Sequence, residues 1–221
     1  MRVISTRILD LPKTIYFNFK VFPFKVALRL PVLISRHVKT KKLHKGSIEI
    51  KSDLSRFMIK IGIGGSQGQI GNEKGFWLIQ KGAKVIFEGS AGFSKGNSIR
   101  VDSGYMHIGD NFNSNSFSLY HCVNHIKFGD NVLIGCHVTF RDNDGHTILY
   151  NEDQPRYNNK AIIIGSNVWI CAKVDILKGS IIPDGCVVGY RSCVLTEFQQ
   201  KNCIIAGYPA KVLRENISWK K

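Results

Sequence analysis

The chain has 221 residues, of which 43% are hydrophobic, enough for one sizeable core and typical of a globular protein. Its formal net charge is +15, but residues 1–60 hold 14 Lys or Arg against 3 Asp or Glu, whereas residues 61–221 hold 17 against 13. Because the positive charge gathers in the N-terminal part, the composition argues against a nucleic-acid-binding protein.

The N-terminal segment, residues 1–60, interleaves aromatic and basic residues. Lys20, Lys25 and Arg29 interrupt its apolar residues too often for a membrane-spanning helix, and we expect no secretory signal. Two compatible interpretations stay open. The segment caps one end of the fold, or it rests on an anionic membrane surface.

The six cysteines form no C-x-x-C pair and have no regular spacing. They are Cys122, Cys136, Cys171, Cys186, Cys193 and Cys203. Cysteines in this pattern usually pack in the core as small buried residues and do not form a disulfide framework or a metal site. We therefore expect a cytoplasmic protein in a reducing compartment, with contact at the inner face of the membrane left open.

From Lys60 to Asn113 the chain is rich in Gly and Ser, and its apolar residues recur irregularly. The polar cluster that follows, residues 111–116, predicts either a corner turn or the wall of a site.

A period of six residues governs the two stretches that come next. The aliphatic or aromatic residues at this period are Phe128, Ile134 and Phe140, then Ile164, Ile170, Ile176, Ile182, Val188 and Val194. Neither a helix nor a single strand has this period, but short strands joined by regular corners do, and three such faces make a coil of about eighteen residues. The sequence predicts an all-β parallel solenoid over residues 61–198, with less regular coils before Phe128.

A polar stretch, residues 141–160, separates the two regular runs. It carries the sequence Asp-Asn-Asp-Gly-His at 142–146, and it cannot form a buried strand. A loop of this length in an otherwise regular solenoid is more often functional than neutral. His146 on spacing alone is an ordinary loop histidine.

These residues resemble the hexapeptide-repeat acyltransferases, which have a left-handed parallel β-helix, and among them the sugar and polysaccharide O-acetyltransferases. The resemblance rests on the repeats, on Asn-Val-Trp-Ile at 167–170 and on Ala-Gly-Tyr-Pro-Ala-Lys-Val at 206–212. It implies an N-terminal cap, the β-helix with its inserted catalytic loop at 141–160, and a C-terminal segment, residues 199–221, that closes the cofactor site.

The resemblance also implies a catalytic machinery. A histidine in the corresponding loop is the general base, which here is His146. An asparagine from a preceding coil lies near the acceptor, for which Asn115 is the best match and Asn113 a near alternative. Neutral imidazole suits removal of a proton from a sugar hydroxyl at cellular pH. Asp144 or Asp142 could hold the imidazole, although either residue could equally form a surface turn.

Acetyl-CoA is the acyl donor that the resemblance implies, and no metal is required. Trp169 would line the cofactor channel, because the inward positions belong to Ile164 and Ile170. The other expected contacts are Cys171, Ala172, Gly189, Tyr190, Arg191, Pro209, Lys211 and Arg214. Tyr190 and Arg191 depart from the small residues common in the family, and Cys171 replaces a common glycine.

The resemblance further implies a homotrimer with sites between neighbouring subunits and a sugar or glycan acceptor. Three other functions stay open. An amino-sugar N-acetyltransferase would use the same fold and base. A zinc-dependent, carbonic-anhydrase-like solenoid would take ligands from His121, His125, His137 or His146, and a non-enzymatic polybasic protein would bind through the N-terminal segment.

Overall fold

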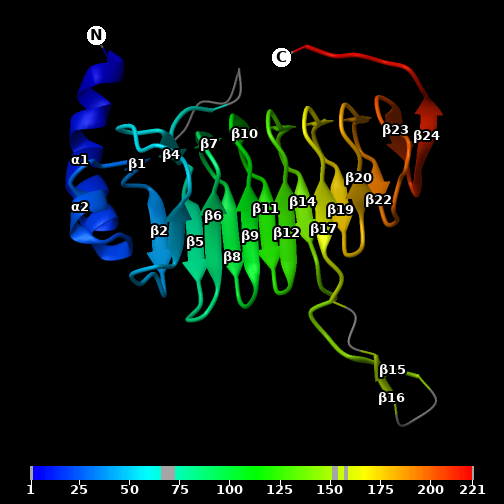
Figure 1. The fold of residues 1–221 in the computed structure, drawn as a ribbon, viewed down its shortest axis with the longest axis horizontal. Coiled ribbons are helices and arrows are strands. Elements are labelled where there is room, and N and C mark those ends of the chain that lie inside the picture. The colour runs from blue at the N-terminus through cyan, green and yellow to red at the C-terminus, as the bar shows by residue number, and fades with distance from the viewer. Residues whose placement is uncertain (1, 66–72, 151–153, 157–158, 221) are drawn as a thin grey trace.

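The computed structural model describes residues 2–65, 73–150, 154–156 and 159–220, and within them the chain forms a parallel β-helix with two N-terminal helices (Figure 1). Helices α1 (Arg2–Val21) and α2 (Phe24–Ala27) lie at one end, and the coils follow one another along a single axis. None of the described helices is both long and apolar enough to cross a membrane.

Three sheets form the faces of the solenoid. Sheet A contains β1 (Val32–Ile34), β4 (Ile59–Ile61), β7 (Ala91–Phe93), β10 (Phe112–Ser114), β13 (Leu133–Ile134), β18 (Trp169–Ile170), β21 (Val187–Val188), β23 (Ile204–Gly207) and β24 (Ala210–Arg214). Sheet B contains β2 (Val38–Lys41), β5 (Gly75–Ile79), β8 (Ser98–Val101), β11 (Leu119–Cys122), β14 (Thr139–Arg141), β19 (Asp175–Leu177) and β22 (Cys193–Val194). Sheet C contains β3 (Ile48–Ile50), β6 (Lys84–Phe87), β9 (Tyr105–Ile108), β12 (His125–Phe128), β17 (Ile162–Ile164) and β20 (Ile181–Ile182).

The period of six residues places one apolar side chain inside each face of the coil. The nine residues predicted to point inward, from Phe128 to Val194, are all at most 1% exposed. Between β21 and β23 the pairing is still parallel, and β24 then turns back antiparallel to end sheet A. The predicted parallel solenoid is confirmed, and so are the less regular coils before Phe128, which supply β4 to β11.

Residues in the left-handed backbone region form the corners. Asn111, Asn131 and Asn167 have φ between 53° and 57° and precede sheet A strands in three successive coils. Asparagine tolerates this conformation better than most residues, because its short polar side chain bonds locally. The side chains of Asn111 and Asn131 are joined by a hydrogen bond of 2.9 Å, which links neighbouring corners.

The coils begin earlier than the sequence indicated. Strands β1, β2 and β3 belong to the three sheets, although residues 1–60 were assigned to a cap. All three residues of β1 are buried, because α1 packs against this strand, and the usual alternation of inward and outward residues is therefore missing there. The helical part of the cap is confined to α1 and α2.

Candidate active site

The insertion between β14 and β17 leaves the solenoid at the corner between sheets B and C. Strands β15 (Ile148–Tyr150) and β16 (Gln154–Arg156) form an antiparallel hairpin that projects away from the coils (Figure 1). The flanking strands keep their pairing across it, since β14 pairs with β19 and β12 pairs with β17. The insertion is therefore an addition to a corner that leaves the coil register unchanged.

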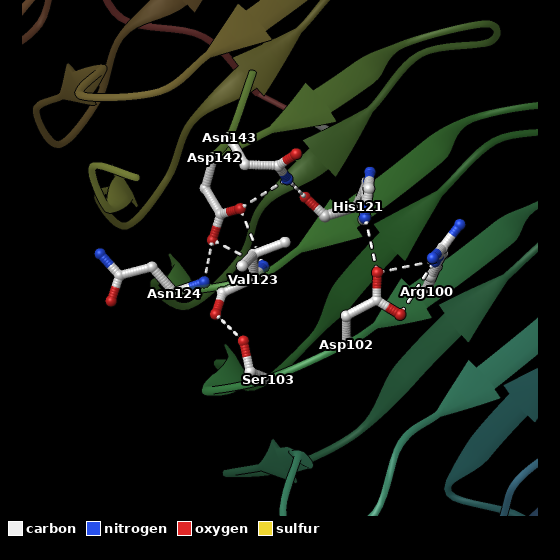
Figure 2. Close-up of polar contacts among 8 residues, drawn as sticks. All are labelled: Arg100, Asp102, Ser103, His121, Val123, Asn124, Asp142 and Asn143. Atoms are coloured by element: carbon white, nitrogen blue, oxygen red, sulfur yellow. Dashed lines mark hydrogen bonds and ion pairs between the residues drawn. The ribbon is translucent and has the colours of Figure 1, made fainter. Parts of the chain in front are cut away.

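Asp142 fixes the base of the insertion to the preceding coil. Its side chain is fully buried and accepts backbone hydrogen bonds from Val123, at 2.9 and 3.1 Å, and from Asn124, at 2.8 Å (Figure 2). The amide of Asn143 adds a bond of 3.1 Å to the same carboxylate. These bonds set the direction in which the chain leaves β14 and enters residues 143–147.

A cavity of about 670 Å³ lies between the insertion and the outer face of sheet B. His146 and Thr147 line it from the insertion, and Arg100, His121 and Arg141 line it from the sheet. The last three occupy equivalent positions in β8, β11 and β14, because His121 pairs in register with both Arg100 and Arg141. The cavity thus has a basic wall and a histidine on either side.

A hydrogen-bonded group of three side chains occupies this wall. Asp102 accepts bonds from Arg100 Nε, at 2.9 Å to Oδ1, and from His121 Nε2, at 3.0 Å to Oδ2 (Figure 2). Partial burial opposes ionisation of Asp102, but the bonds from Arg100 and His121 outweigh it and lower the pKa of the carboxyl. A neutral His121 that donates from Nε2 keeps Nδ1 as a hydrogen-bond acceptor.

The structure places His146 at the cavity with an exposed side chain, and it gives this ring no hydrogen bond within the described residues. Asp144 forms an ion pair with Lys178, and the carboxylate of Asp142 is occupied by backbone groups. Within the described part of the chain, neither aspartate forms a hydrogen bond or ion pair with His146. The orienting role of Asp144 stays a prediction, and Asp142 has a structural role instead.

Asn115 lies just after β10, at the end of sheet A, and its backbone N–H donates to Ile134 at 2.9 Å. It does not line the cavity that contains His146. His146 and Asn115 therefore belong to different corners of one chain.

The predicted cofactor residues gather along sheet A and at its corner with sheet B. Trp169 points outward and is 37% exposed, as expected from the inward position of Ile170. Trp219 lies tilted against it, with ring centroids 6.0 Å apart, and donates a hydrogen bond of 2.8 Å to the carbonyl of Asn167. The C-terminal segment thus reaches Trp169. This segment runs along the edge of the solenoid opposite the insertion (Figure 1).

The remaining cofactor candidates have different degrees of exposure. Tyr190 is exposed, with the cations of Lys173 and Arg191 lying 6.0 and 5.6 Å from its ring centroid. Cys171, Ala172 and Gly189 are half-buried near this corner, whereas Pro209, Lys211 and Arg214 are exposed on or beside β24. Burial raises the pKa of the Cys171 thiol, which suits a wall residue better than a nucleophile.

The histidines of the zinc alternative are spread over separate environments. His121 bonds to Asp102, His125 packs on Tyr105 with centroids 4.3 Å apart, and His137 stacks on Phe117. Among the described residues, no three His, Cys, Asp or Glu side chains are placed to hold a metal ion together.

Sequence reasoning missed Arg100, Asp102 and Arg141, and it considered His121 only as a zinc ligand. The available signal was the spacing of outward polar residues, since Arg100, His121 and Arg141 recur at nearly one coil length. This spacing becomes informative only when the strand register is known.

Comparison with known proteins places this geometry in context, although no family model matches the chain. An uncharacterized 24.8 kDa protein from the cps region of Klebsiella pneumoniae is 31% identical over 205 residues, which cover 91% of this chain and 87% of that protein. A polysialic acid O-acetyltransferase of Escherichia coli O1:K1 is 32% identical over 149 residues, 67% of this chain and 42% of that enzyme. The crystal structure of the polysialic acid O-acetyltransferase OatWY superposes with a TM-score of 0.56 and 19% identity. The match covers 84% of this chain and 88% of the OatWY chain. The likeness to that structure concerns the fold.

Proposed function

The chain belongs to the hexapeptide-repeat acyltransferases of left-handed β-helix fold, and from this premise we propose that it transfers acetyl from acetyl-CoA to a sugar hydroxyl. The acceptor would be part of a cell-surface polysaccharide or of its precursor. One observation carries the proposal. His146 lines a cavity of about 670 Å³ on the outer face of the solenoid, opposite a second histidine that is held by a carboxylate.

His146 would act as the general base. A sugar hydroxyl is a weak nucleophile until its proton is removed as the new bond forms, and neutral imidazole accepts that proton at cellular pH. Its exposed position at the cavity leaves the ring accessible to an acceptor. The hydroxyl oxygen then attacks the acetyl carbonyl directly, and the thiol of coenzyme A leaves. Asn115 is the proposed donor to the developing oxyanion.

The residues along sheet A fit a coenzyme A molecule chemically. Trp169 offers an exposed aromatic face to an extended pantetheine arm, and the exposed cations Lys211 and Arg214 suit phosphate groups. When bound, the thioester supplies an already activated acetyl group, so the protein has no need for its own nucleophile.

We propose that the site forms between neighbouring subunits of a trimer. Within one chain, His146 belongs to the corner between sheets B and C, whereas Trp169 and the exposed cations belong to sheet A. A complete site then needs the insertion of one copy beside sheet A of another. Mixing His146→Ala with Trp169→Ala subunits before refolding tests this. Recovery of activity in the mixture is expected, and no recovery despite mixed trimers would contradict a shared site.

A screen of acceptors by thiol release from acetyl-CoA tests the activity itself. With an accepted sugar, His146→Ala should lower kcat by about 10²–10⁴-fold, the usual contribution of a general base. His44→Ala serves as the control, since His44 lies in the first coils and outside the cavity. Full activity in His146→Ala would refute the proposed base. Acetylation of a 4-amino sugar, but of no hydroxyl acceptor, would favour the N-acetyltransferase.

A cytoplasmic site of action fits the state of the cysteines. None of the six, all of which lie among the described residues, is in a disulfide, and four of them are buried, which is ordinary in a reducing compartment.

A further inference from the structure

Helix α1 has two different apolar faces, and only one is used by the fold. Phe17 and Val21 are buried against the first coil. There the side-chain amide of Asn18 donates a hydrogen bond to the carbonyl of Val32 and accepts one from its backbone N–H. On another side of the helix lie Ile8, 61% exposed, and Ile15, 47% exposed. Apolar side chains at positions 8, 11 and 15 follow helical spacing and form an exposed line along α1, and Phe19, which is partly buried against the core, ends it.

Helix α2 continues this line. The rings of Phe19 and Phe24 meet edge to face with centroids 5.7 Å apart, and Phe24 is 65% exposed. Leu28, one helical turn further, is 55% exposed. We call this surface the apolar stripe, and it consists of Ile8, Leu11, Ile15, Phe19, Phe24 and Leu28. Five of these six side chains are exposed, and the contact between Phe19 and Phe24 joins the two helices, whereas isolated exposed apolar residues need no explanation.

Positive charge surrounds the stripe. Lys25 and Arg29 directly follow Phe24 and Leu28 in the chain, and both side chains are exposed. Lys20 lies over the ring of Tyr16, on the flank of α1, at 5.4 Å. In residues 1–48 there are 11 Lys or Arg and one acidic residue, Asp10, which is buried and pairs with Arg36.

We propose that the apolar stripe docks onto the surface of an anionic lipid bilayer. Apolar side chains of a helix that lies in the interface enter the boundary between headgroups and acyl chains, while Lys and Arg remain at the phosphates. The dense positive charge favours lipid over a second copy of the chain, because two copies would bring like charges together. Since α1 and α2 form one end of the solenoid, the coils extend away from the bilayer and leave the insertion accessible (Figure 1).

Vesicle sedimentation with the full chain tests the proposal. We expect binding to phosphatidylcholine vesicles that contain phosphatidylglycerol, weak binding to pure phosphatidylcholine, and a steep loss with added salt. The variant Ile15→Ser/Phe24→Ser should bind at least tenfold more weakly, because burying one large apolar side chain contributes about 1.5–3 kcal/mol, or at least about tenfold. Lys25→Gln should lower binding about fivefold, from about 1 kcal/mol per basic residue.

Leu213→Ser is the matched control. Leu213 is 67% exposed, like Phe24, but it lies on β24 at the other end of the solenoid. The proposal requires this variant to bind as the wild type does, with all variants equally folded by circular dichroism. Equal binding of wild type and Ile15→Ser/Phe24→Ser, or equal binding to neutral and anionic vesicles, would overturn it. So would a lower oligomeric state of the stripe variant without vesicles, which would assign the stripe to a contact between copies.

Discussion

Replacing Asp142 by alanine should detach the insertion from the solenoid and lower global stability. The carboxylate accepts two backbone N–H groups, from Val123 and Asn124, and the substitution leaves both without their partner. An unsatisfied buried donor costs about 1–3 kcal/mol, so two donors would cost about 2–6 kcal/mol. Val123 is only half-buried and Asn124 is exposed, and water entering the vacated space would satisfy part of this demand. We therefore expect a loss of about 2–3 kcal/mol.

Denaturant and thermal unfolding of purified protein measure this loss. For a chain of this size, 1 kcal/mol lowers Tm by about 2–4 °C, so a decrease of about 4–12 °C is expected. Asp144→Ala is the matched control two residues away. It removes a partly exposed ion pair with Lys178 and should cost less than about 1 kcal/mol. A loss in Asp142→Ala no larger than in Asp144→Ala would refute the anchoring role.

Three further outcomes are expected. Asp102→Asn should destabilise the protein at pH 7 but much less at acidic pH. Hydrogen bonds that lower the pKa of this carboxyl stabilise the fold above its unfolded pKa of about 3.9, and this stabilisation is lost as the pH falls through the folded pKa. A difference in unfolding free energy between variant and wild type that stays constant from pH 7 to pH 3 would contradict this. Maleimide should label only the half-buried Cys136 and Cys171 in the native protein, as mass spectrometry would show, and labelling of the four buried thiols without denaturant would disprove their protection. Tyr120→Phe should cost about 1 kcal/mol in denaturant unfolding, since it removes a buried 2.7 Å bond to Ser114, and an unchanged midpoint would argue against that bond.

The regular coils could be predicted because their pattern has one physical cause. Each face of the triangle buries one side chain, so the inward positions from Phe128 to Val194 recur at six residues. Trp169 followed as an outward residue from the same rule. The rule failed at β1, where α1 buries all three residues and removes the alternation that marks a strand.

The candidate site could be predicted only in part. His146 was predicted from the family resemblance and from its place in the insertion, but its neighbours His121 and Arg100 lie one and two coils earlier in the chain. Their proximity depends on strand register, which corner lengths decide and periodicity alone does not give. For Asp142 the sequence suggested the wrong role. An aspartate near a loop histidine suggests catalysis, but the buried carboxylate of Asp142 accepts hydrogen bonds from backbone N–H groups.

The unchanged pairing on both sides of the insertion has an evolutionary consequence. Strands β14 and β19 pair in register across the insertion, so the length and composition of residues 143–160 can vary without repacking the core. Doubling the length of a flexible loop costs only about 0.6 kcal/mol in closure entropy. Such a solenoid can exchange the segment that faces its acceptor while its coils are retained, and substrate preference can then diverge much faster than the scaffold.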